Sequence, residues 1–148
     1  MGCHVEIKAI DGGEITIGSN VHFADNATVV CRYGSLTIGN NSYVGKGSVI
    51  VARERITVGR GALIAEYVTI RDQHHGMERA ELAFYEQPFT TSPISIGENV
   101  WLGAKSTVLK GVAIGSDVVV GANSVVTKDV ADKSTVVGVP ARLTGPTA

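Results

Sequence analysis

One short stretch of the chain combines side chains that can transfer protons. Residues 70–76 read Ile-Arg-Asp-Gln-His-His-Gly, so that two adjacent histidines follow an aspartate closely. A neutral imidazole is well suited to act as a general base near pH 7, because its reference pKa is about 6.5. His75 is therefore a candidate catalytic base. The competing interpretation is a solvated surface histidine.

The residues around these histidines follow a six-residue repeat. An aliphatic residue followed by glycine recurs along nearly the whole chain: Ile17-Gly18, Ile38-Gly39, Val44-Gly45, Val58-Gly59, Ile96-Gly97, Leu102-Gly103, Ile114-Gly115 and Val120-Gly121. A period of six is too long for the alternation of a strand and out of step with an α-helix. It fits a parallel β-helix in which each hexad forms one flat side and three hexads form a triangular coil.

Each hexad predicts two inward-facing positions and a corner. The residue four places after the aliphatic one should also face inward, and it is small or β-branched at Val21, Ala27, Ser42, Ser48, Ala62, Val68, Val100, Ser106, Val112, Val118, Ser124 and Val130. We expect the glycine of each pair to occupy the corner with a positive φ. Asn20, Asn26, Asn41, Asn99 and Asp117 should tolerate such corners too. Because the interior is filled by side chains, a ligand must bind outside the prism.

The spacing of the repeats predicts one all-β domain of about six coils. From Ile96 to Ile114 the step is 18 residues, one coil without insertion, whereas from Val58 to Ile96 it is 38, which leaves 38 − 18 = 20 extra residues. We assign these to a long exposed loop over 76–93, with about one helical turn, that is more often functional than idle. The predicted layout is an N-terminal cap over 1–14, coils over 15–75 and 94–136, and a C-terminal segment over 137–148.

Three residues break the rule of small inward positions. Tyr33, Glu54 and His74 each fall in the third hexad of their coil, so stacked coils would align them on one side beside the insertions. Repeated exceptions at one place in an otherwise consistent fold indicate function. The column forms one wall of a substrate groove in one interpretation. In the other, the inserted corners shift the register and turn these side chains to solvent.

Composition excludes several classes of function. The net charge is −1 and aromatic residues make up 5% of the chain, which argues against a nucleic-acid-binding surface. Cys3 and Cys31 have no metal-binding or redox spacing. With no signal peptide or long apolar run, we expect a cytoplasmic protein without membrane insertion.

In three stretches the chain resembles the hexapeptide-repeat acyltransferases, specifically their sugar and xenobiotic O-acetyltransferase branch. These are 70–76 with its histidine, Ile96-Gly97-Glu98-Asn99-Val100-Trp101-Leu102-Gly103, and residues 121–130 followed by Val137-Gly138-Val139-Pro140-Ala141-Arg142. The resemblance covers about residues 15–143. It implies a left-handed β-helix, acetyl-CoA as the acyl donor, and a homotrimer with each active site between adjacent prisms.

The resemblance also implies roles for residues near the histidines. His75 matches the catalytic histidine, which would take the proton from an acceptor hydroxyl. His74 is the fallback if the alignment shifts by one, and is otherwise a candidate for substrate binding. Asp72 would orient the histidine ring or contact the acceptor, and an ordinary role at a corner is the alternative.

Six further residues match positions that bind the acyl donor. Trp101 matches a tryptophan near the catalytic histidine and the thioester arm, although packing within a trimer would also explain it. Ala104 and Ala122 match backbone positions along the pantetheine arm. Thr127, Lys128 and Arg142 match positions that meet the nucleotide and its phosphates, where cations pair with anionic oxygens. For Lys128 an ordinary solvated lysine is the alternative.

The acceptor is expected to be a small molecule with a hydroxyl group, of carbohydrate type. The loop 76–93 departs most from the family, so the acceptor is expected to be recognised there, with Tyr85 as a candidate contact. The chain lacks the N-terminal helical region of the maltose and galactoside acetyltransferases, which weakens assignment to those acceptors. An antibiotic acetyltransferase and a non-catalytic β-helix trimer are the alternative functions.

A zinc enzyme of the γ-carbonic anhydrase class shares the expected fold but needs three histidine ligands spread over two subunits. The chain has only His4, His22, His74 and His75, two of them adjacent. The required spacing is absent, and we expect no metal.

Overall fold

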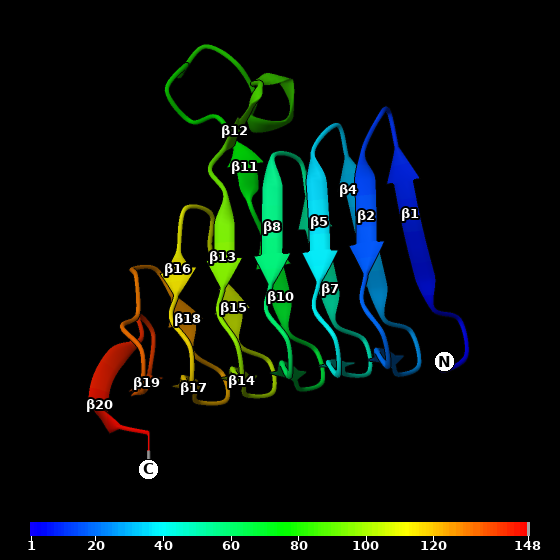
Figure 1. The fold of residues 1–148 in the computed structure, drawn as a ribbon. Coiled ribbons are helices and arrows are strands. Elements are labelled where there is room, and N and C mark those ends of the chain that lie inside the picture. The colour runs from blue at the N-terminus through cyan, green and yellow to red at the C-terminus, as the bar shows by residue number, and fades with distance from the viewer. Residues whose placement is uncertain (148) are drawn as a thin grey trace.

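A computed structural model describes residues 1–147. Figure 1 shows three sheets whose strands follow one another in turn along the chain. The six-stranded sheet contains β1 (Glu6–Ile10), β4 (Thr28–Arg32), β7 (Val49–Ala52), β10 (Thr69–Arg71), β15 (Thr107–Val108) and β18 (Val125–Val126). The five-stranded sheet contains β2 (Glu14–Ile17), β5 (Ser35–Ile38), β8 (Arg55–Val58), β13 (Ile94–Ile96) and β16 (Ala113–Ile114). The seven-stranded sheet contains β3 (His22–Phe23), β6 (Tyr43–Val44), β9 (Leu63–Ile64), β14 (Trp101–Leu102), β17 (Val119–Val120), β19 (Ser134–Val137) and β20 (Arg142–Pro146).

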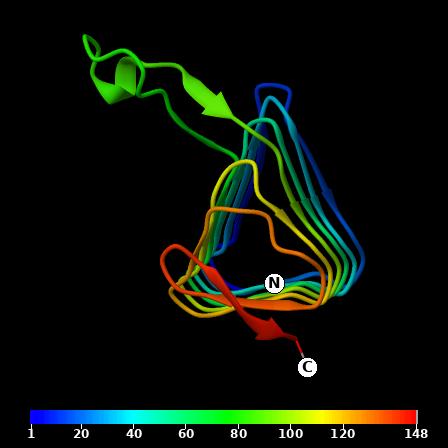
Figure 2. The same cartoon turned by 90° about the vertical axis from the view of Figure 1, so that its left-hand side faces the viewer.

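The three sheets enclose a triangular prism, seen along its axis in Figure 2. Within these three sheets, each strand pairs in parallel with the equivalent strand of the next coil, except that β20 runs antiparallel to its neighbour, β19. The fold is a left-handed parallel β-helix of about six turns, which confirms the architecture that the repeat predicts. Neighbouring coils satisfy one another's backbone groups, so the strands can be as short as two residues.

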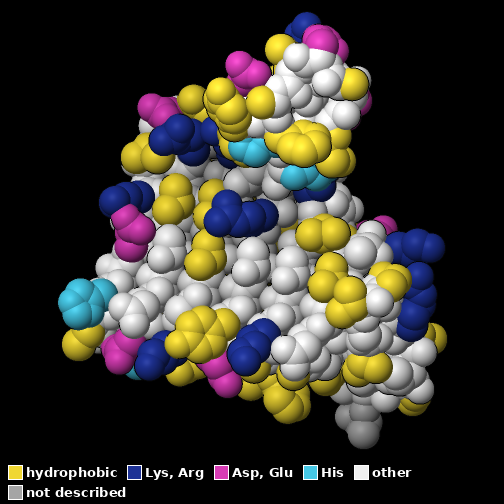
Figure 3. Space-filling model, turned by 180° about the vertical axis from the view of Figure 1, so that it is seen from behind, with side chains coloured by type: hydrophobic (Ala, Val, Ile, Leu, Met, Phe, Trp, Pro, Cys, Tyr) yellow, Lys and Arg dark blue, Asp and Glu magenta, His cyan; other side chains and the backbone are white. Residues whose placement is uncertain are grey.

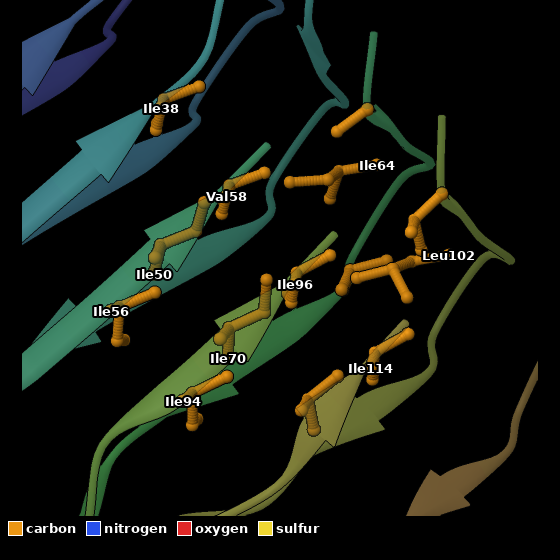
Figure 4. Close-up of a cluster of buried hydrophobic side chains, with 14 of the residues drawn as sticks. Ile38, Ile50, Ile56, Val58, Ile64, Ile70, Ile94, Ile96, Leu102 and Ile114 are labelled. Atoms are coloured by element: carbon orange, nitrogen blue, oxygen red, sulfur yellow. The ribbon is translucent and has the colours of Figure 1, made fainter. Parts of the chain in front are cut away.

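The interior is filled by the positions that the repeat assigns to it. Isoleucine, valine and leucine from all three sheets pack against one another along the axis, as Figure 4 shows for ten labelled residues from Ile38 to Ile114. All of the predicted small inward positions are buried except Val21, which is partly buried. Among the buried serines, Ser48 Oγ donates to the carbonyl of Ala65 at 2.7 Å and accepts from Val68 N at 3.1 Å, whereas Ser106 Oγ has no partner among the described residues. Cys31 also lies in this core, where burial raises the pKa of its thiol.

The expected positive φ at the paired glycines is wrong. The glycines with positive φ are Gly12, Gly47, Gly61, Gly111 and Gly138, none of them a member of a pair. The paired glycines are needed for space instead, because a Cβ on Gly45 would overlap the backbone of Ala65 in the next coil. The tight corner falls two residues later. There Asn20, Asn26, Asn41, Asn99 and Asp117 have φ between 53° and 59°, as expected for these side chains.

The ends and the loop differ in detail from the predicted layout. Residues 6–10 form β1 and pair in parallel with β4, so the expected N-terminal cap already belongs to the coils. At the other end, β20 covers the last coil. The long insertion leaves one corner and projects on the side of the six-stranded sheet (Figure 2). Its base is an antiparallel pair of β11 (Gln73–His75) and β12 (Phe89–Thr91), and it contains the short 3₁₀ helix η1 (Phe84–Glu86), which matches the predicted helical turn.

Candidate active site

His75 lies at the end of β11, at the base of the loop. Its ring packs against Phe89 of the paired strand β12, with 4.1 Å between ring centroids and 36° between planes. Its Nδ1 lies 3.4 Å from the backbone carbonyl oxygen of Gln87. The imidazole is half-buried and is held by the returning strand of the loop.

The contact with Gln87 favours one tautomer of His75. A carbonyl oxygen can only accept a hydrogen bond, so Nδ1 is the donor wherever this bond forms. In the neutral ring, Nε2 is then an acceptor with a free lone pair. This is the state that a general base requires, and a long hydrogen bond of this kind is common in the absence of substrate.

Gln87 holds the loop closed through its side chain. Its amide is 4% exposed and forms three hydrogen bonds: Oε1 accepts from Arg79 N at 3.1 Å, and Nε2 donates to the carbonyls of Arg79 at 3.0 Å and Leu82 at 3.3 Å. Beside it, Gly76 N donates to the carbonyl of Pro88 at 2.8 Å. The sequence alone does not predict that Gln87 and Phe89 contact His75, because contacts across a loop leave no periodic signal.

His74 points away from the interior and is exposed. Its Nδ1 lies 2.7 Å from the carbonyl oxygen of His75 and 3.0 Å from Thr90 Oγ1. By the same argument from the carbonyl, Nδ1 carries the proton in His74 too. Nε2 of His74 is thus left as a possible contact for a ligand.

Asp72 has a structural role at a corner of the coil. It does not have the alternative role, which is contact with the acceptor. Its carboxylate is fully buried and accepts the backbone N–H groups of Arg53 at 2.8 Å, Glu54 at 2.8 Å and Arg55 at 2.9 Å. These three bonds hold the preceding coil at the corner where its chain turns. A buried carboxylate with its oxygens so occupied has no surface to offer an acceptor, so the prediction of substrate binding by Asp72 is wrong.

The polar column is turned outward. Tyr33 has a φ of 74° and is 59% exposed, and Glu54 is exposed as well. This agrees with the register-shift interpretation. The column nevertheless borders the histidine, because the guanidinium of Arg53 lies 5.5 Å from the Tyr33 ring centroid and 3.7 Å from that of Phe89. Tyr85 lies on η1 of the loop and is 79% exposed.

The predicted donor-binding residues lie on other parts of the prism. Trp101 is half-exposed on the seven-stranded sheet, in register with Leu63 and Val119. Ala104 and Ala122 occupy equivalent places on successive coils, at the corner that joins this sheet to the six-stranded one. A single chain thus has Trp101 and His75 on different faces.

The structure brings the cationic candidates together at the C-terminal end. Lys128 and Arg142 line one hollow of about 340 Å³ together with Leu143 of β20. Thr127 lines a separate groove of about 320 Å³ on the outer face of the six-stranded sheet, together with His74. Thr127, although adjacent to Lys128 in the chain, thus lines a different hollow from the two cations.

Residues 1–147 hold no group of three His, Cys, Asp or Glu side chains placed to bind a metal ion. Over the same residues, no helix has the length and apolar character needed to cross a membrane.

Comparison with known proteins agrees with this architecture. The family model described as hexapeptide repeat of succinyl-transferase matches residues 35–66 and 93–128. A probable acetyltransferase of Mycobacterium tuberculosis, Rv3034c, is 35% identical over 144 residues, 97% of this chain and 48% of the relative. A putative lipopolysaccharide biosynthesis O-acetyl transferase of Escherichia coli, WbbJ, is 36% identical over 130 residues, 83% of this chain and 59% of the relative. The chain thus spans about half to three fifths of the length of these relatives.

Among solved structures, galactoside acetyltransferase in complex with coenzyme A matches with a TM-score of 0.71 and 30% identity, over 91% of this chain and 65% of that one. In its repeat, its prism and these relatives, the chain is similar to the hexapeptide-repeat acyltransferases. The sugar O-acetyltransferases among the matches represent the branch that the motifs predict.

Proposed function

We propose that this chain is an acetyl-CoA-dependent O-acetyltransferase that transfers an acetyl group to a hydroxyl of a small, carbohydrate-type acceptor. The observation that carries the proposal is the 3.4 Å contact of His75 Nδ1 with the carbonyl oxygen of Gln87, which leaves Nε2 unprotonated in the neutral ring. A base prepared in this way, beside a loop that projects from the prism, suits removal of a proton from a bound hydroxyl.

The reaction follows from this geometry. His75 Nε2 takes the proton as the acceptor oxygen attacks the thioester carbonyl carbon. A C–O bond forms, and the tetrahedral intermediate collapses with cleavage of the C–S bond. The proton on Nε2 then passes to the departing sulfur, which gives free coenzyme A and restores the neutral imidazole. No covalent enzyme intermediate is needed, and a preorganised N–H donor would stabilise the oxyanion.

In this proposal, Lys128 and Arg142 bind the phosphates of the donor, and Thr127 meets its nucleotide. The shared hollow of Lys128 and Arg142 supports this role, because two cations on one surface pair well with anionic oxygens. Ala104 and Ala122 would follow the pantetheine arm, and Trp101 would lie beside the thioester. The coenzyme A complex of galactoside acetyltransferase, which has the same fold, supports a donor site of this kind.

The proposed assembly is a homotrimer. His75 and Trp101 lie on different faces of one prism, so only a second copy can supply the tryptophan to the histidine. Cyclic symmetry would repeat this junction three times and give three equal sites. The loop projects beyond the six-stranded sheet, where it can reach a neighbouring copy (Figure 2).

For the acceptor we propose a carbohydrate hydroxyl, approached by His74 and by Tyr85 of the loop. Support comes from the names of the relatives, which include lipopolysaccharide and galactoside acetyltransferases. A cytoplasmic location is part of the same proposal.

The test is a panel of hydroxylated acceptors, both sugars and antibiotics, with release of free thiol from acetyl-CoA as the readout. Transfer to at least one sugar is expected. Binding of acetyl-CoA is measured in parallel by the increase in melting temperature that a ligand specific for the native state must produce. Transfer to antibiotics alone would assign the xenobiotic alternative. Absence of any shift at millimolar acetyl-CoA would favour a non-catalytic trimer.

A further inference from the structure

A second groove lies on the six-stranded sheet beneath the base of the loop. It has a volume of about 240 Å³, and its lining includes Arg32, Arg53, Arg71, Gln73 and Phe89. Figure 3 faces this sheet and shows Lys and Arg side chains below the loop, close to the histidines. The groove adjoins the candidate base, because Phe89 packs against both Arg53 and His75.

Two of the three arginines have free guanidinium groups. Arg32 pairs with Asp11 at 3.2 Å. Within residues 1–147, Arg53 and Arg71 have no carboxylate within 4.0 Å and their guanidinium groups donate no hydrogen bond. The nearest acidic side chain along the sequence, Glu54, is exposed and makes no ion pair with Arg53. Cations without partners on one groove are suited to bind an anion.

Gln73 provides evidence for a ligand at this groove that is independent of the arginines, because its side chain lacks a hydrogen-bond partner. Its side chain is 8% exposed, and its Oε1 is buried without a hydrogen bond among the described residues. A buried amide oxygen without a partner destabilises the fold, and because it can only accept a hydrogen bond, its missing partner is a donor. Gln73 lines the groove of the arginines and also the groove shared by His74 and Thr127, so a hydroxyl of a ligand in either groove could satisfy it.

The groove is held in shape before any ligand binds. The three hydrogen bonds to Asp72 fix the backbone of the corner that carries Arg53. The guanidinium then stacks 3.7 Å from the centroid of Phe89, which leaves its N–H edge free to donate. An arginine oriented in this way loses little side-chain entropy when it binds.

We propose that this groove binds an acidic sugar, with its carboxylate or phosphate on Arg53 and Arg71 and one of its hydroxyls donating to Gln73 Oε1. The inference rests on the proposed O-acetyltransferase function and narrows its substrate class to acidic sugars or sugar phosphates. Phe89 contacts both Arg53 and His75, so a sugar whose anion is bound at Arg53 can present a hydroxyl across its ring to the histidine. Arg53 and Arg71 are therefore residues that determine specificity.

The test compares three acceptors that differ in one group: galactose, galacturonate and galactose 6-phosphate. With acetyl-CoA and a free-thiol readout, kcat/KM for at least one of the two anionic acceptors should exceed that for galactose by about tenfold or more. Arg53→Gln and Arg71→Gln should each remove most of this preference by raising KM for the anionic acceptor. Arg55→Gln, which removes an exposed positive charge on the other side of the same corner, should retain the preference.

Binding without acetyl-CoA separates failure of this inference from failure of the proposed reaction. The anionic sugars should raise the melting temperature of the wild-type protein more than galactose does, and should not do so for Arg53→Gln, even if no acetyl group is transferred. The comparison of galacturonate with galactose 6-phosphate identifies the carboxylate or the phosphate as the ligand group. Equal binding of all three sugars would overturn the inference. An Arg53→Gln variant that keeps the acceptor preference would also overturn the inference, even if the variant loses its oligomeric state.

Discussion

At the scale of single residues, the candidate base depends on a partner outside the repeat. His75 stands at the end of a coil, but its ring is oriented by Gln87 and Phe89 from the other end of the loop. Its neighbour His74 is exposed, and its ring is anchored on the carbonyl of His75. The two adjacent histidines thus have different environments, because the ring of His75 is half-buried against Phe89 whereas His74 is exposed.

Replacement of His75 by alanine tests the base. Because no other group near the loop base has an equivalent free nitrogen beside Phe89, we expect acetyl transfer to fall by about 10²–10⁴-fold. The increase in melting temperature caused by acetyl-CoA should remain, since in the proposed reaction the histidine removes a proton and does not hold the donor. His22→Ala, at an exposed histidine of the seven-stranded sheet, is the control. Equal loss in both variants would contradict the role of His75.

Lys128→Ala tests the donor site. Removal of one exposed cation from the hollow that it shares with Arg142 should raise KM for acetyl-CoA by about two- to tenfold with little change in kcat. Lys46→Ala makes the same change of charge on an early coil and should alter neither parameter. A fall in kcat at unchanged KM would show that Lys128 acts elsewhere in the reaction.

At the scale of elements, the loop between β11 and β12 is a folded unit with its own buried polar centre. The amide of Gln87 satisfies backbone groups at two points of the loop, and the backbone carbonyl of the same residue contacts His75. Loop conformation and orientation of the base are therefore coupled through one residue. The coils beneath do not depend on this contact.

Gln87→Ala should reduce activity without unfolding the prism. The change removes the hydrogen-bond partner of the backbone N–H and carbonyl of Arg79 and should open the loop locally, which removes the contact that orients His75. We expect kcat to fall at least about tenfold, with faster hydrogen exchange and proteolysis confined to residues 76–88 and little change in melting temperature. Glu81→Ala, which removes only an exposed ion pair with Arg79, is the control. Normal kcat despite an opened loop would refute the coupling.

At the scale of the whole molecule, stability depends on close contact between successive coils. The coils stack at strand spacing, so the backbone of one coil lies directly against that of the next. At the paired glycines this contact leaves no space for a side chain. The consequence is a prism whose interior is complete and whose chemistry must lie at its corners and outer faces.

Gly45→Ala tests this packing. The new methyl group would overlap the backbone of Ala65, so the coils must separate locally, and we expect a loss of about 1–3 kcal/mol in the free energy of unfolding. Gly145→Ala is the matched control, because a Cβ there meets no atom within 4 Å and φ is not positive. Denaturant or thermal unfolding measures the difference. Equal stability of the two variants would show that the coils can separate at no cost.

The sequence by itself determined the solenoid, its number of coils, its inward-facing residues and the place of the long insertion. Each of these follows from a local period, because every coil repeats the same contacts with the next. Only the tertiary structure showed that the paired glycines leave space for the next coil and that Asp72 stabilises a corner. It also showed that Gln87 and Phe89 orient His75. Those contacts join residues in different coils or at opposite ends of a loop, where their relation depends on three-dimensional packing and leaves no repeat in the chain.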